Sequence, residues 1–346
     1  MRSLSNALRL FTASSTLLAI GIMAAPMAQA SSYYNCNTPH GCSKIDSTDS
    51  HSDYGATKYP IVMAHGFLGW NRLLNTLDYF NGVPQVLMKN GTTVFTTKTS
   101  SVNSSEVRGE QLLQQVRTIE ALMDSGKVNL VGHSQGGFDS RYVATVAADK
   151  IASVTTVSTP HQGTKTADFA VETLENDNTP NKFGTKVFEA SLVAVGLSLD
   201  ALSAVPLDQL QEQNVRNVAA TTSTASNLAF NKKYPAPIPS SYCGMPPTNN
   251  VLNGVGYYSW SGSQTFTNAL DPSDYLLTLL GKTHEGEAND GFVTPCSSRV
   301  GFVIRDDYRM NHLDSINQLL GMTSWRETNP LTVYRNHVNR LKNAGY

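Results

Sequence analysis

A serine flanked by glycines is the feature that most constrains how this chain can fold. The pentapeptide GHSQG, residues 132–136, follows the apolar run VNLV at 128–131. Beyond it, up to Lys150, apolar residues recur at helical spacing: Phe138, Tyr142, Val143 and Val146. The run predicts a buried strand and the recurrence predicts a helix, so Ser134 stands on the turn between them. Glycines leave room for a strained turn there, although an ordinary glycine-rich turn would have the same composition.

The neighbouring segments repeat this alternation of strand and helix. Strands are predicted at 59–64, 93–97 and 151–157, and a helix is predicted to start at Asn103, with Glu106 three residues later. One face of that helix is apolar: Leu112, Leu113, Val116, Ile119 and Met123. The alternation predicts an α/β fold in which helices cover a mostly parallel sheet. Sites in such sheets lie at the carboxyl ends of strands, where Ser134 and the dipeptide His65-Gly66 both fall.

The amino terminus has the layout of a secretory signal peptide. Two arginines precede the apolar run 17–25, and Ala28-Gln29-Ala30 offers small residues at the cleavage spacing. We expect cleavage after Ala30 and secretion, not a membrane anchor, because a spanning helix needs about 20 apolar residues. Removing the two arginines takes the formal net charge from −1 to −3. No basic patch stands out, so a nucleic-acid partner is not expected.

The rest of the chain, 31–346, is predicted to form one large domain at 59–346 preceded by a polar extension at 31–58. It has four cysteines, and an even number in an exported protein indicates disulfides, here with three pairings open. The simplest pairing joins Cys36 to Cys42, which would close the extension, and Cys243 to Cys296. A metal site is a weaker interpretation of these cysteines, because the sequence contains no C-x-x-C pair. The Ser/Thr-rich stretch 219–227 is interpreted as a loop.

A serine hydroxyl is a weak nucleophile until a base takes its proton, and the eight histidines are the candidate bases. Six of them are interpreted as structural or surface residues from their places in the chain. His40 and His51 lie in the polar extension, His65 and His133 at turns beside glycines, His284 in a charged loop and His337 on a predicted carboxyl-terminal helix. His161, which follows a strand, competes with His312. His312 follows a predicted strand at 300–304, and a loop after a late strand is where an α/β sheet of this kind presents its base.

The acid is expected between the serine and the base. Asp290, in an Asp-Gly turn, can face the imidazole and hold its tautomer. Four other carboxylates compete with it: Asp274, Glu285, Glu287 and Asp306. An oxyanion hole needs two backbone N–H donors, one from the residue after the nucleophile, Gln135, and one from the turn after an early strand, Phe67.

Together these segments resemble the secreted bacterial triacylglycerol lipases of the Pseudomonas and Burkholderia type, the family I true lipases with an α/β-hydrolase fold. The stretches that carry the resemblance are YPIVMAHGFLG at 59–69, GHSQGG at 132–137, LDPSD at 270–274, ANDGFV at 288–293, CSS at 296–298, VIRDDYRMNHLD at 303–314 and YR at 334–335. They extend over most of the chain from Tyr59 onward. The segment 36–58, with its two cysteines, does not follow the family's pattern.

The resemblance assigns the roles that the residues alone leave open. It implies Ser134 as nucleophile, Asp290 as acid and His312 as base, with Phe67 and Gln135 as oxyanion donors. It pairs Cys243 with Cys296. It also implies a structural Ca²⁺ ion near the base, bound by four residues: the carboxylates of Asp271 and Asp314 and the main-chain carbonyls of Gln318 and Met322. Oxygen donors of this kind suit a hard cation.

The resemblance also places a mobile helical lid around 181–204, where apolar residues are unusually frequent. A buried core helix would show the same pattern. Many of these lipases need a membrane-anchored foldase to mature and leave the cell from the periplasm, so we expect both here. The expected substrate is a long-chain triacylglycerol at a lipid–water interface. Two alternatives remain: a short-chain carboxylesterase without interfacial activation, and a non-catalytic lipid-binding protein on a hydrolase scaffold.

Overall fold

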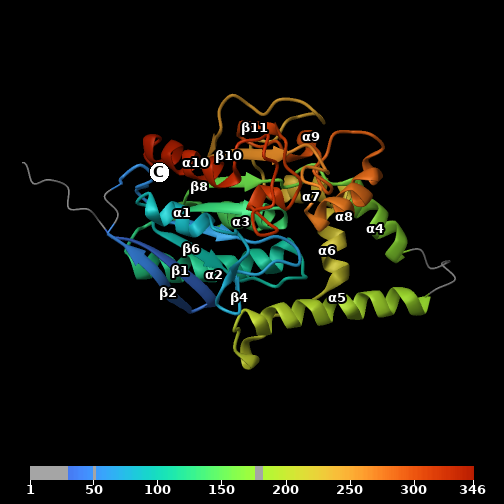
Figure 1. Ribbon diagram of the computed structural model, residues 1–346, viewed down its shortest axis with the longest axis horizontal. Helices are drawn as coiled ribbons and strands as arrows, with labels where there is room; N and C mark the ends of the chain where they lie inside the picture. Colours follow the sequence, from blue (N-terminus) through green and yellow to red (C-terminus); the bar gives the residue numbers. More distant parts are fainter. Residues whose placement is uncertain (1–29, 50–51, 176–181) are drawn as a thin grey trace, which may run out of the picture.

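A mostly parallel β-sheet forms the centre of the computed structural model, which describes residues 30–49, 52–175 and 182–346 (Figure 1). In this described part nine strands join in the order β11-β10-β8-β7-β3-β6-β1-β2, with β9 paired to β10. Among the described strands of this sheet, only the β1–β2 and β9–β10 pairs are antiparallel. The strands are β1 Ser31–Thr38, β2 Gly41–Thr48, β3 Ile61–Ala64, β6 Val94–Thr97, β7 Val128–His133, β8 Ile151–Val157, β9 Val251–Leu252, β10 Val255–Gly262 and β11 Phe302–Tyr308. A separate ribbon pairs β4 Arg72–Leu73 with β5 Leu77–Asp78.

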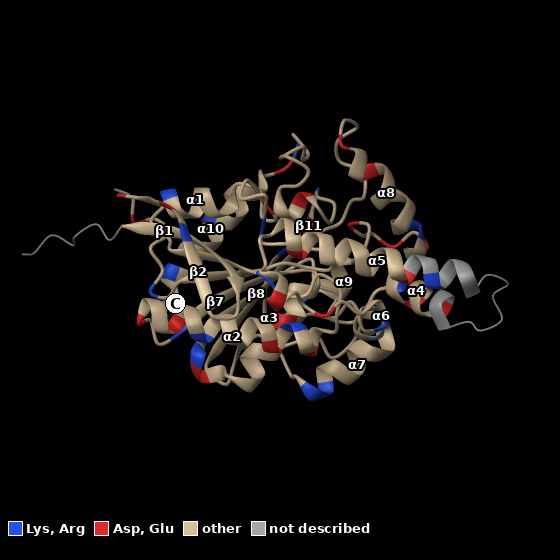
Figure 2. Ribbon diagram, turned by 90° about the horizontal axis from the view of Figure 1, so that it is seen from below, with Lys and Arg blue, Asp and Glu red and all other residues tan. Residues whose placement is uncertain are grey.

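Helices cover both faces of this sheet, as the alternation in the sequence predicts. In the view of Figure 2, α1 and α10 lie above the sheet and α2 and α3 below it. The α-helices are α1 Val83–Lys89, α2 Ser105–Met123, α3 Gln135–Val146, α4 Lys165–Glu175, α5 Lys182–Leu202, α6 Val215–Thr222, α7 Thr224–Lys233, α8 Pro272–Gly281, α9 Pro295–Ser298 and α10 Pro330–Asn343. Short 3₁₀ turns are η1 Ala148–Lys150, η2 Leu207–Gln209, η3 Lys282–His284 and η4 Asp314–Ile316.

Two apolar cores lie on opposite faces of the sheet, because a strand covered on both faces must be apolar on both. The core under α2 and α3 includes Leu112, Val116 and Phe138. The core on the opposite face includes Val83 and Leu87 of α1 and residues 333–341 of α10. The strands between them are buried along their whole length at β3, β6, β7 and β8. This rigid sheet fixes the positions of the loops at its carboxyl edge.

The segment expected to be an extension outside the 59–346 domain is instead part of the central sheet. β1 pairs in parallel with β6, from Tyr33 opposite Val94 to Cys36 opposite Thr97, and β2 forms the edge beyond it. Tyr33 and Cys36 are fully buried. The polar side chains of β1 hydrogen-bond inside the sheet; Asn35 Oδ1, for example, accepts from Thr96 Oγ1 at 2.9 Å. A search for apolar alternation misses such a strand, because hydrogen bonds between its polar side chains and their partners offset the cost of burying them.

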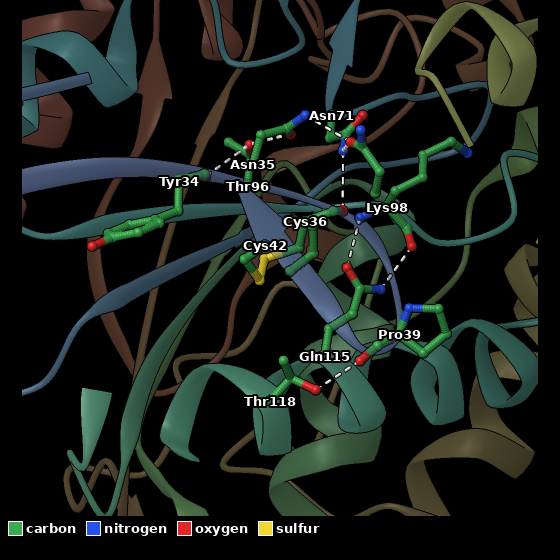
Figure 3. The surroundings of a disulfide bond; sticks show 12 residues. Tyr34, Asn35, Cys36, Pro39, Cys42, Asn71, Thr96, Lys98, Gln115 and Thr118 are labelled. Atoms are coloured by element: carbon green, nitrogen blue, oxygen red, sulfur yellow. Dashed lines mark hydrogen bonds between the residues drawn. A yellow bond between two sulfur atoms is a disulfide. The ribbon is translucent and has the colours of Figure 1, made fainter. Parts of the chain in front are cut away.

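The disulfides pair as the simplest arrangement predicts. Cys36–Cys42 closes the β1–β2 hairpin, and Cys243–Cys296 joins the loop before β9 to α9. Figure 3 shows the first disulfide between the sheet and α2, where Thr118 Oγ1 donates to Pro39 O at 2.7 Å. On the other side Asn71 Nδ2 donates to Cys36 O at 3.1 Å. The hairpin therefore holds α2 and the loop that follows β3.

Three local predictions differ from the structure. The stretch 219–227, expected to be a loop, is occupied by the end of α6 and the start of α7, where the Ser223 side chain caps α7. The helix expected from Asn103 is capped one residue later, because Ser104 accepts from Val107 N while Asn103 Oδ1 accepts from Ser104 N. The helix expected to reach Lys150 ends at Val146 and continues as η1.

The predicted signal peptide lies outside the described residues except for its last residue, Ala30. No helix in 30–49, 52–175 or 182–346 combines the length and the apolarity needed to cross a bilayer.

Candidate active site

Ser134 lies on a strained turn between β7 and α3, where the strand–turn–helix pattern placed it. Its backbone φ is 53° and ψ is −125°, an uncommon conformation for a residue with a Cβ atom. The turn is tight on both sides: a Cβ on Gly132 would collide with the carbonyl of Gly136, and one on Gly136 with the carbonyl of Ala64. The Ser134 amide donates to Val157 O of β8 at 2.8 Å. The two glycines are thus a steric requirement of this turn.

Asp290 and His312, 22 residues apart in the chain, are in direct contact. His312 Nδ1 lies 2.9 Å from Asp290 Oδ2, and the His312 amide donates to Asp290 O at 2.8 Å. The other carboxylate oxygen, Oδ1, accepts from the amides of Phe292 and Val293 at 3.0 and 2.8 Å. A carboxylate facing Nδ1 holds the proton there and leaves the Nε2 lone pair free to act as a base. Both side chains are buried, Asp290 completely.

The competing candidates have other partners. The ring nitrogens of His161 contact Arg141 Nη1 at 3.1 Å and Thr156 Oγ1 at 3.0 Å, in a fully buried position. Burial lowers the pKa of His161 well below its usual value, with the Arg141 charge adding to the effect. The other carboxylates are engaged elsewhere: Glu285 with Lys165, Glu287 with Tyr242, Asp306 with Arg299 and Asp274 with Asn311.

The two candidate oxyanion donors are on loops that meet beside Ser134. A Cβ on Gly66, the residue before Phe67, would approach Ser134 Cβ to 2.8 Å. Among the described residues, neither the Phe67 amide nor the Gln135 amide donates to a backbone or side-chain acceptor. Two amides left free at the amino end of α3 and on the adjacent turn suit a developing negative charge.

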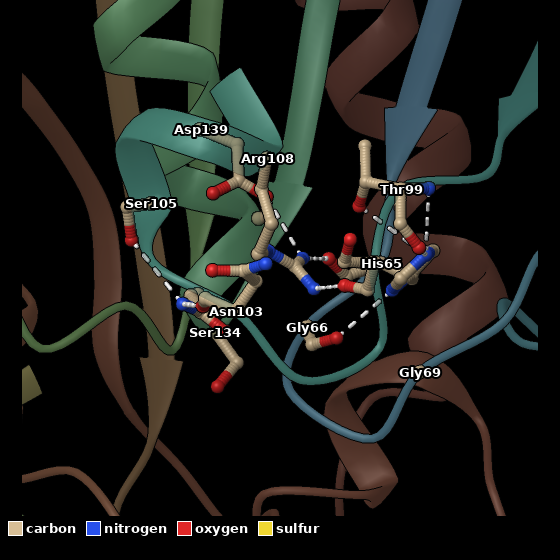
Figure 4. A network of polar contacts seen from close by, with 12 residues as sticks. His65, Gly66, Gly69, Thr99, Asn103, Ser105, Arg108, Ser134 and Asp139 are labelled. Atoms are coloured by element: carbon tan, nitrogen blue, oxygen red, sulfur yellow. Dashed lines mark hydrogen bonds and ion pairs between the residues drawn. The ribbon is translucent and has the colours of Figure 1, made fainter. Parts of the chain in front are cut away.

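Arg108 links these two loops and was not identified from the sequence (Figure 4). Its guanidinium donates to His65 O at 2.6 Å and forms an ion pair with Asp139 of α3 at 2.8 Å. Both side chains are fully buried. The sequence does indicate that Arg108 is buried, because it lies four residues before Leu112 and therefore on the apolar face of α2. The ion pair holds the turn after β3 against the helix that follows Ser134.

A cavity of about 410 Å³ opens beside these residues, and Ser134, Gln135, Phe67 and His312 all line it. Most of the remaining lining is apolar: Leu68, Trp70, Ala167, Ala170, Leu192, Val215, Val218, Phe292, Val293, Leu313, Ile316 and Leu319. A pocket of this kind, with a few polar groups converging at one point, suits an apolar ligand carrying one reactive polar bond.

Helix α5, the segment expected to be a lid, forms part of this cavity through Leu192 and lies beside the body of the molecule (Figure 1). Figure 2 shows that few charged residues lie along its described part. The side chains of Val195 and Leu197 are 44% and 39% exposed, so α5 is not a buried core helix at these positions. At its carboxyl end Asp200 forms a fully buried ion pair with Lys98, 2.6 Å away.

The four candidate calcium ligands lie in the loops around α8 and η4. Asp271 caps α8 through one oxygen, which accepts from Ser273 N at 2.7 Å, while its Oδ2 is buried and unpartnered. Asp314 Oδ2 accepts from Thr267 Oγ1 at 2.6 Å and from Asn311 N at 3.0 Å, while its Oδ1 is unpartnered. Burial, with the neighbouring Asp274 and Asp271 carboxylates, raises the pKa of Asp314 to about 7. Gln318 and Met322 follow on the same loop.

Such a pair of orphaned carboxylate oxygens fits an oxygen-seeking cation. A second cluster does not fit a metal: Cys243 and Cys296 lie near Glu287, but their sulfurs are joined in a disulfide.

Comparisons with known proteins identify the family of this chain. Residues 59–238 match the family described as alpha/beta hydrolase fold. A triacylglycerol lipase of Vibrio cholerae is 45% identical over 296 residues, which cover 86% of this chain and 91% of that protein. A triacylglycerol lipase of Pseudomonas fragi is 39% identical, over 84% of this chain and 98% of that protein. One from Burkholderia plantarii is 35% identical, over 84% and 88%.

Solved structures support the fold independently of close sequence similarity. The mature form of a Bacillus licheniformis lipase aligns with a TM-score of 0.54 at 19% identity, over 84% of this chain and 94% of that one. A Staphylococcus hyicus lipase aligns with a TM-score of 0.53 at 15% identity, over 83% and 97%. The fold and the strained serine turn define a serine ester hydrolase of the α/β-hydrolase class. Within that class, the chain belongs to the family of bacterial triacylglycerol lipases represented in Vibrio, Pseudomonas and Burkholderia.

Proposed function

We propose that this protein hydrolyses the ester bonds of long-chain triacylglycerols at a lipid–water interface. The observation that carries the proposal is the apolar cavity whose wall includes Ser134 and His312, with His312 bound to the buried Asp290. An acyl chain can be buried against apolar side chains, and each of its buried methylenes contributes about 0.8 kcal/mol. The ester carbonyl then lies where the polar groups converge.

In the first half of the reaction Ser134 Oγ attacks the ester carbonyl while His312 Nε2 takes its proton. Asp290 accepts from Nδ1 and stabilises the imidazolium that forms. The carbonyl oxygen becomes an anion, and the free amides of Phe67 and Gln135 donate to it. His312 then returns the proton to the alcohol oxygen of the leaving acylglycerol, and the acyl group stays on Ser134.

The second half reverses these steps with water as the nucleophile. His312 Nε2 takes a proton from water, the resulting hydroxide attacks the acyl carbonyl, and the same two amides hold the new oxyanion. Collapse of this intermediate returns the proton to Ser134 Oγ and releases the fatty acid. The neutral imidazole must return to the same tautomer after each proton transfer, and the buried contact between Nδ1 and Asp290 favours that tautomer.

The proposal extends to a structural Ca²⁺ ion held by Asp271, Asp314 and the main-chain carbonyls of Gln318 and Met322. The unpartnered buried oxygens of the two carboxylates support it. When bound, the ion would neutralise the two carboxylates, of which Asp314 is made costly to ionise by its burial. Since Asp314 is two residues after His312, these ligands would also fix the loop that presents the base.

Helix α5 is proposed as the lid of the cavity. Leu192 lines the cavity, while Val195 and Leu197 are exposed apolar side chains on the same helix. A helix that exposes apolar residues beside a cavity can exchange its contact with the protein for contact with lipid. The buried Lys98–Asp200 pair would act as the fixed end of the movement.

The route to the outside of the cell is part of the same proposal. The signal-peptide layout of 1–30 and two disulfides suit export through an oxidising compartment. A family foldase in the periplasm would assist maturation, on the strength of the family resemblance. Expression with and without such a foldase, followed by an assay of the culture medium, tests both points.

The decisive experiment measures hydrolysis of emulsified triolein and of dissolved p-nitrophenyl butyrate by the calcium-loaded protein and by Ser134→Ala. A matched control is Ser158→Ala, because Ser158 is another buried serine with a positive φ at the carboxyl end of the neighbouring strand β8. We expect triolein hydrolysis to rise above the solubility limit, to vanish in Ser134→Ala and to persist in Ser158→Ala.

Butyrate hydrolysis without triolein hydrolysis would indicate the short-chain esterase instead. If folded protein hydrolysed neither substrate yet bound lipid, the non-catalytic binding protein would be the better interpretation, and the proposed function would be wrong.

A further inference from the structure

Tyr79 and His133, the residue before Ser134, form a chain of hydrogen bonds that the hydrolytic mechanism does not use. The Tyr79 hydroxyl lies 2.7 Å from His133 Nδ1 and 3.1 Å from the amide of Gly66. On its other side, His133 Nε2 lies 3.0 Å from the main-chain oxygen of His312. Tyr79 is 5% exposed and His133 is fully buried.

The direction of every bond in this chain is fixed by what each group can do. The His312 carbonyl can only accept, so His133 must carry its proton on Nε2. Burial, together with the nearby His312, lowers the pKa of His133 well below its usual value. The ring is therefore neutral and its Nδ1 is an acceptor, which makes the Tyr79 hydroxyl the donor. The Tyr79 oxygen in turn accepts from the Gly66 amide, so no polar atom of the chain lacks a partner.

The chain joins the three parts of the site that must be kept in register. Gly66 precedes Phe67, the proposed oxyanion donor. His133 precedes Ser134, the proposed nucleophile. The carbonyl at the far end belongs to His312, the proposed base, and it also accepts from Ser315 Oγ at 2.7 Å. The Asp290 contact orients the imidazole of His312, but it does not connect that residue to the oxyanion turn.

We propose that Tyr79 and His133 are positioning residues, whose chain from the Gly66 amide to the His312 carbonyl sets the oxyanion turn and the base relative to Ser134. This proposal rests on the proposed function. It concerns the geometry of the site, since His133 does not line the cavity and has no access to substrate.

The neutral state of His133 has a second consequence for the reaction. The rings of His133 and His312 are 4.6 Å apart between centroids. His312 becomes a cation in each half of the reaction, and a second cation at this distance would oppose it. A histidine kept neutral by burial and held in one tautomer gives a fixed hydrogen bond without that repulsion.

Tyr79 also lines the cavity, so a direct contact with substrate is the competing explanation for any effect of its substitution. His133 separates the two explanations. If the chain acts as one unit, changes at Tyr79 and at His133 have the same signature, although only Tyr79 can touch a substrate.

The experiment uses the calcium-loaded full-length enzyme with p-nitrophenyl butyrate, which needs no interface. The variants are Tyr79→Phe, which removes only the hydroxyl; His133→Met, which removes both ring bonds; His133→Gln, whose amide can still donate to the His312 carbonyl; and the double variant Tyr79→Phe/His133→Met. Tyr142→Phe is the matched control, because Tyr142 is 8% exposed and its hydroxyl donates to Glu110, outside the cavity lining.

We expect kcat to fall about tenfold to hundredfold in Tyr79→Phe and His133→Met, with KM changed by less than about threefold, because a buried partner is left unsatisfied. His133→Gln should recover part of the loss. The double variant should be no slower than the slower single variant, because both changes break the same chain. Tyr142→Phe should keep the wild-type kcat.

A second measurement does not depend on turnover. Hydrogen exchange at the Gly66 amide should become faster in Tyr79→Phe, and the ring nitrogens of His133 should show the neutral Nε2–H tautomer by NMR. A folded wild type without ester hydrolysis would refute the proposed function, while this exchange would still report the chain.

The proposal is wrong if Tyr79→Phe lowers kcat and His133→Met does not, or if the two losses multiply. It is also wrong if the Tyr79 effect appears in KM alone, or if Gly66 exchanges equally in both proteins.

Discussion

The buried polar network behind the cavity wall, which we call the floor, and the α5 helix beside the cavity are built on opposite principles. On the floor, the carboxylate of Asp290 has three donors and both ring nitrogens of His133 have partners, all in positions that are almost completely buried. Along α5, a buried ion pair, Lys98–Asp200, lies at the carboxyl end, and apolar side chains such as Val195 face solvent.

On the proposal that α5 is the lid, one domain combines exact chemistry with a variable entrance. Hydrogen bonds and ion pairs out of water hold atoms within fractions of an ångström, as a proton shuttle requires. Apolar contact has no preferred direction and is exchanged for lipid at little cost. Each region can therefore be tested by a change that should leave the other unaffected.

The largest effect is expected at Asp290 on the floor. Asp290→Asn keeps the oxygen that accepts from Phe292 and Val293 but turns the His312 tautomer around, and comparable changes in serine hydrolases cost about 10⁴-fold in kcat. Steady-state hydrolysis of p-nitrophenyl butyrate measures it. Asp306→Asn, at a rejected candidate paired with Arg299, is the control and should stay near wild type. Equal losses in the two variants would contradict the assignment.

The next effect concerns the loop that carries the base. If Asp314 binds Ca²⁺, chelation should lower the melting temperature of the wild type, since an ion at one hundred times its Kd stabilises by about 2.7 kcal/mol. Asp314→Asn should melt lower with calcium and respond little to the chelator. Asp307→Asn, at an exposed carboxylate paired with Arg305, should respond as the wild type does. A wild type whose melting ignores chelator and calcium would remove the ion from the proposal.

A smaller effect should separate α5 from the floor. Val195→Ser with Leu197→Ser removes apolar surface that would enter lipid, and two such side chains weaken partitioning by about tenfold. Triolein hydrolysis should fall by about that factor while butyrate hydrolysis stays unchanged. Leu228→Ser on α7, where the side chain is 56% exposed, controls for the loss of any apolar surface residue. A parallel fall on both substrates would mean that α5 supports the floor.

The smallest effect tests the buried histidines through pH. Burial, with a smaller contribution from Arg340, lowers the pKa of His337 from 6.5 to about 3. Because the unfolded chain then binds a proton that the folded one does not, the stability from this group is full above pH 6.5 and is lost as the pH falls toward 3. One such histidine contributes about 1.4 kcal/mol per pH unit in that window.

The free energy of unfolding of His337→Gln, measured with urea at several pH values between 6.5 and 5, should depend less steeply on pH than that of the wild type. The difference in this slope should reach about 1.4 kcal/mol per pH unit. His40→Gln, at an exposed residue of the hairpin loop, should keep the wild-type slope. Identical slopes in all three proteins would show that His337 is not held neutral.

Several parts of this protein follow from local sequence alone. The strand at 151–157, the strand–turn–helix around Ser134 and the apolar face of α2 were predictable because they depend on residues within a few positions of one another. The resemblance to known lipases then selected Asp290 from five carboxylates. Periodicity could not make this choice, because it depends on a contact between residues 22 positions apart in the chain.

What only the tertiary structure decided are the places where polar residues are buried. Considered alone, the polar side chains of β1 indicate an extension, and the local pattern gives Tyr79 and Arg108 no role and His133 only a place at a turn. In each case the cost of burial is offset by a partner far away in the chain, such as Thr96 for Asn35 or the His312 carbonyl for His133. Burial of apolar residues can be predicted from their spacing along one segment. Burial of polar residues cannot, because it needs hydrogen-bond partners that only the contact between two distant segments supplies.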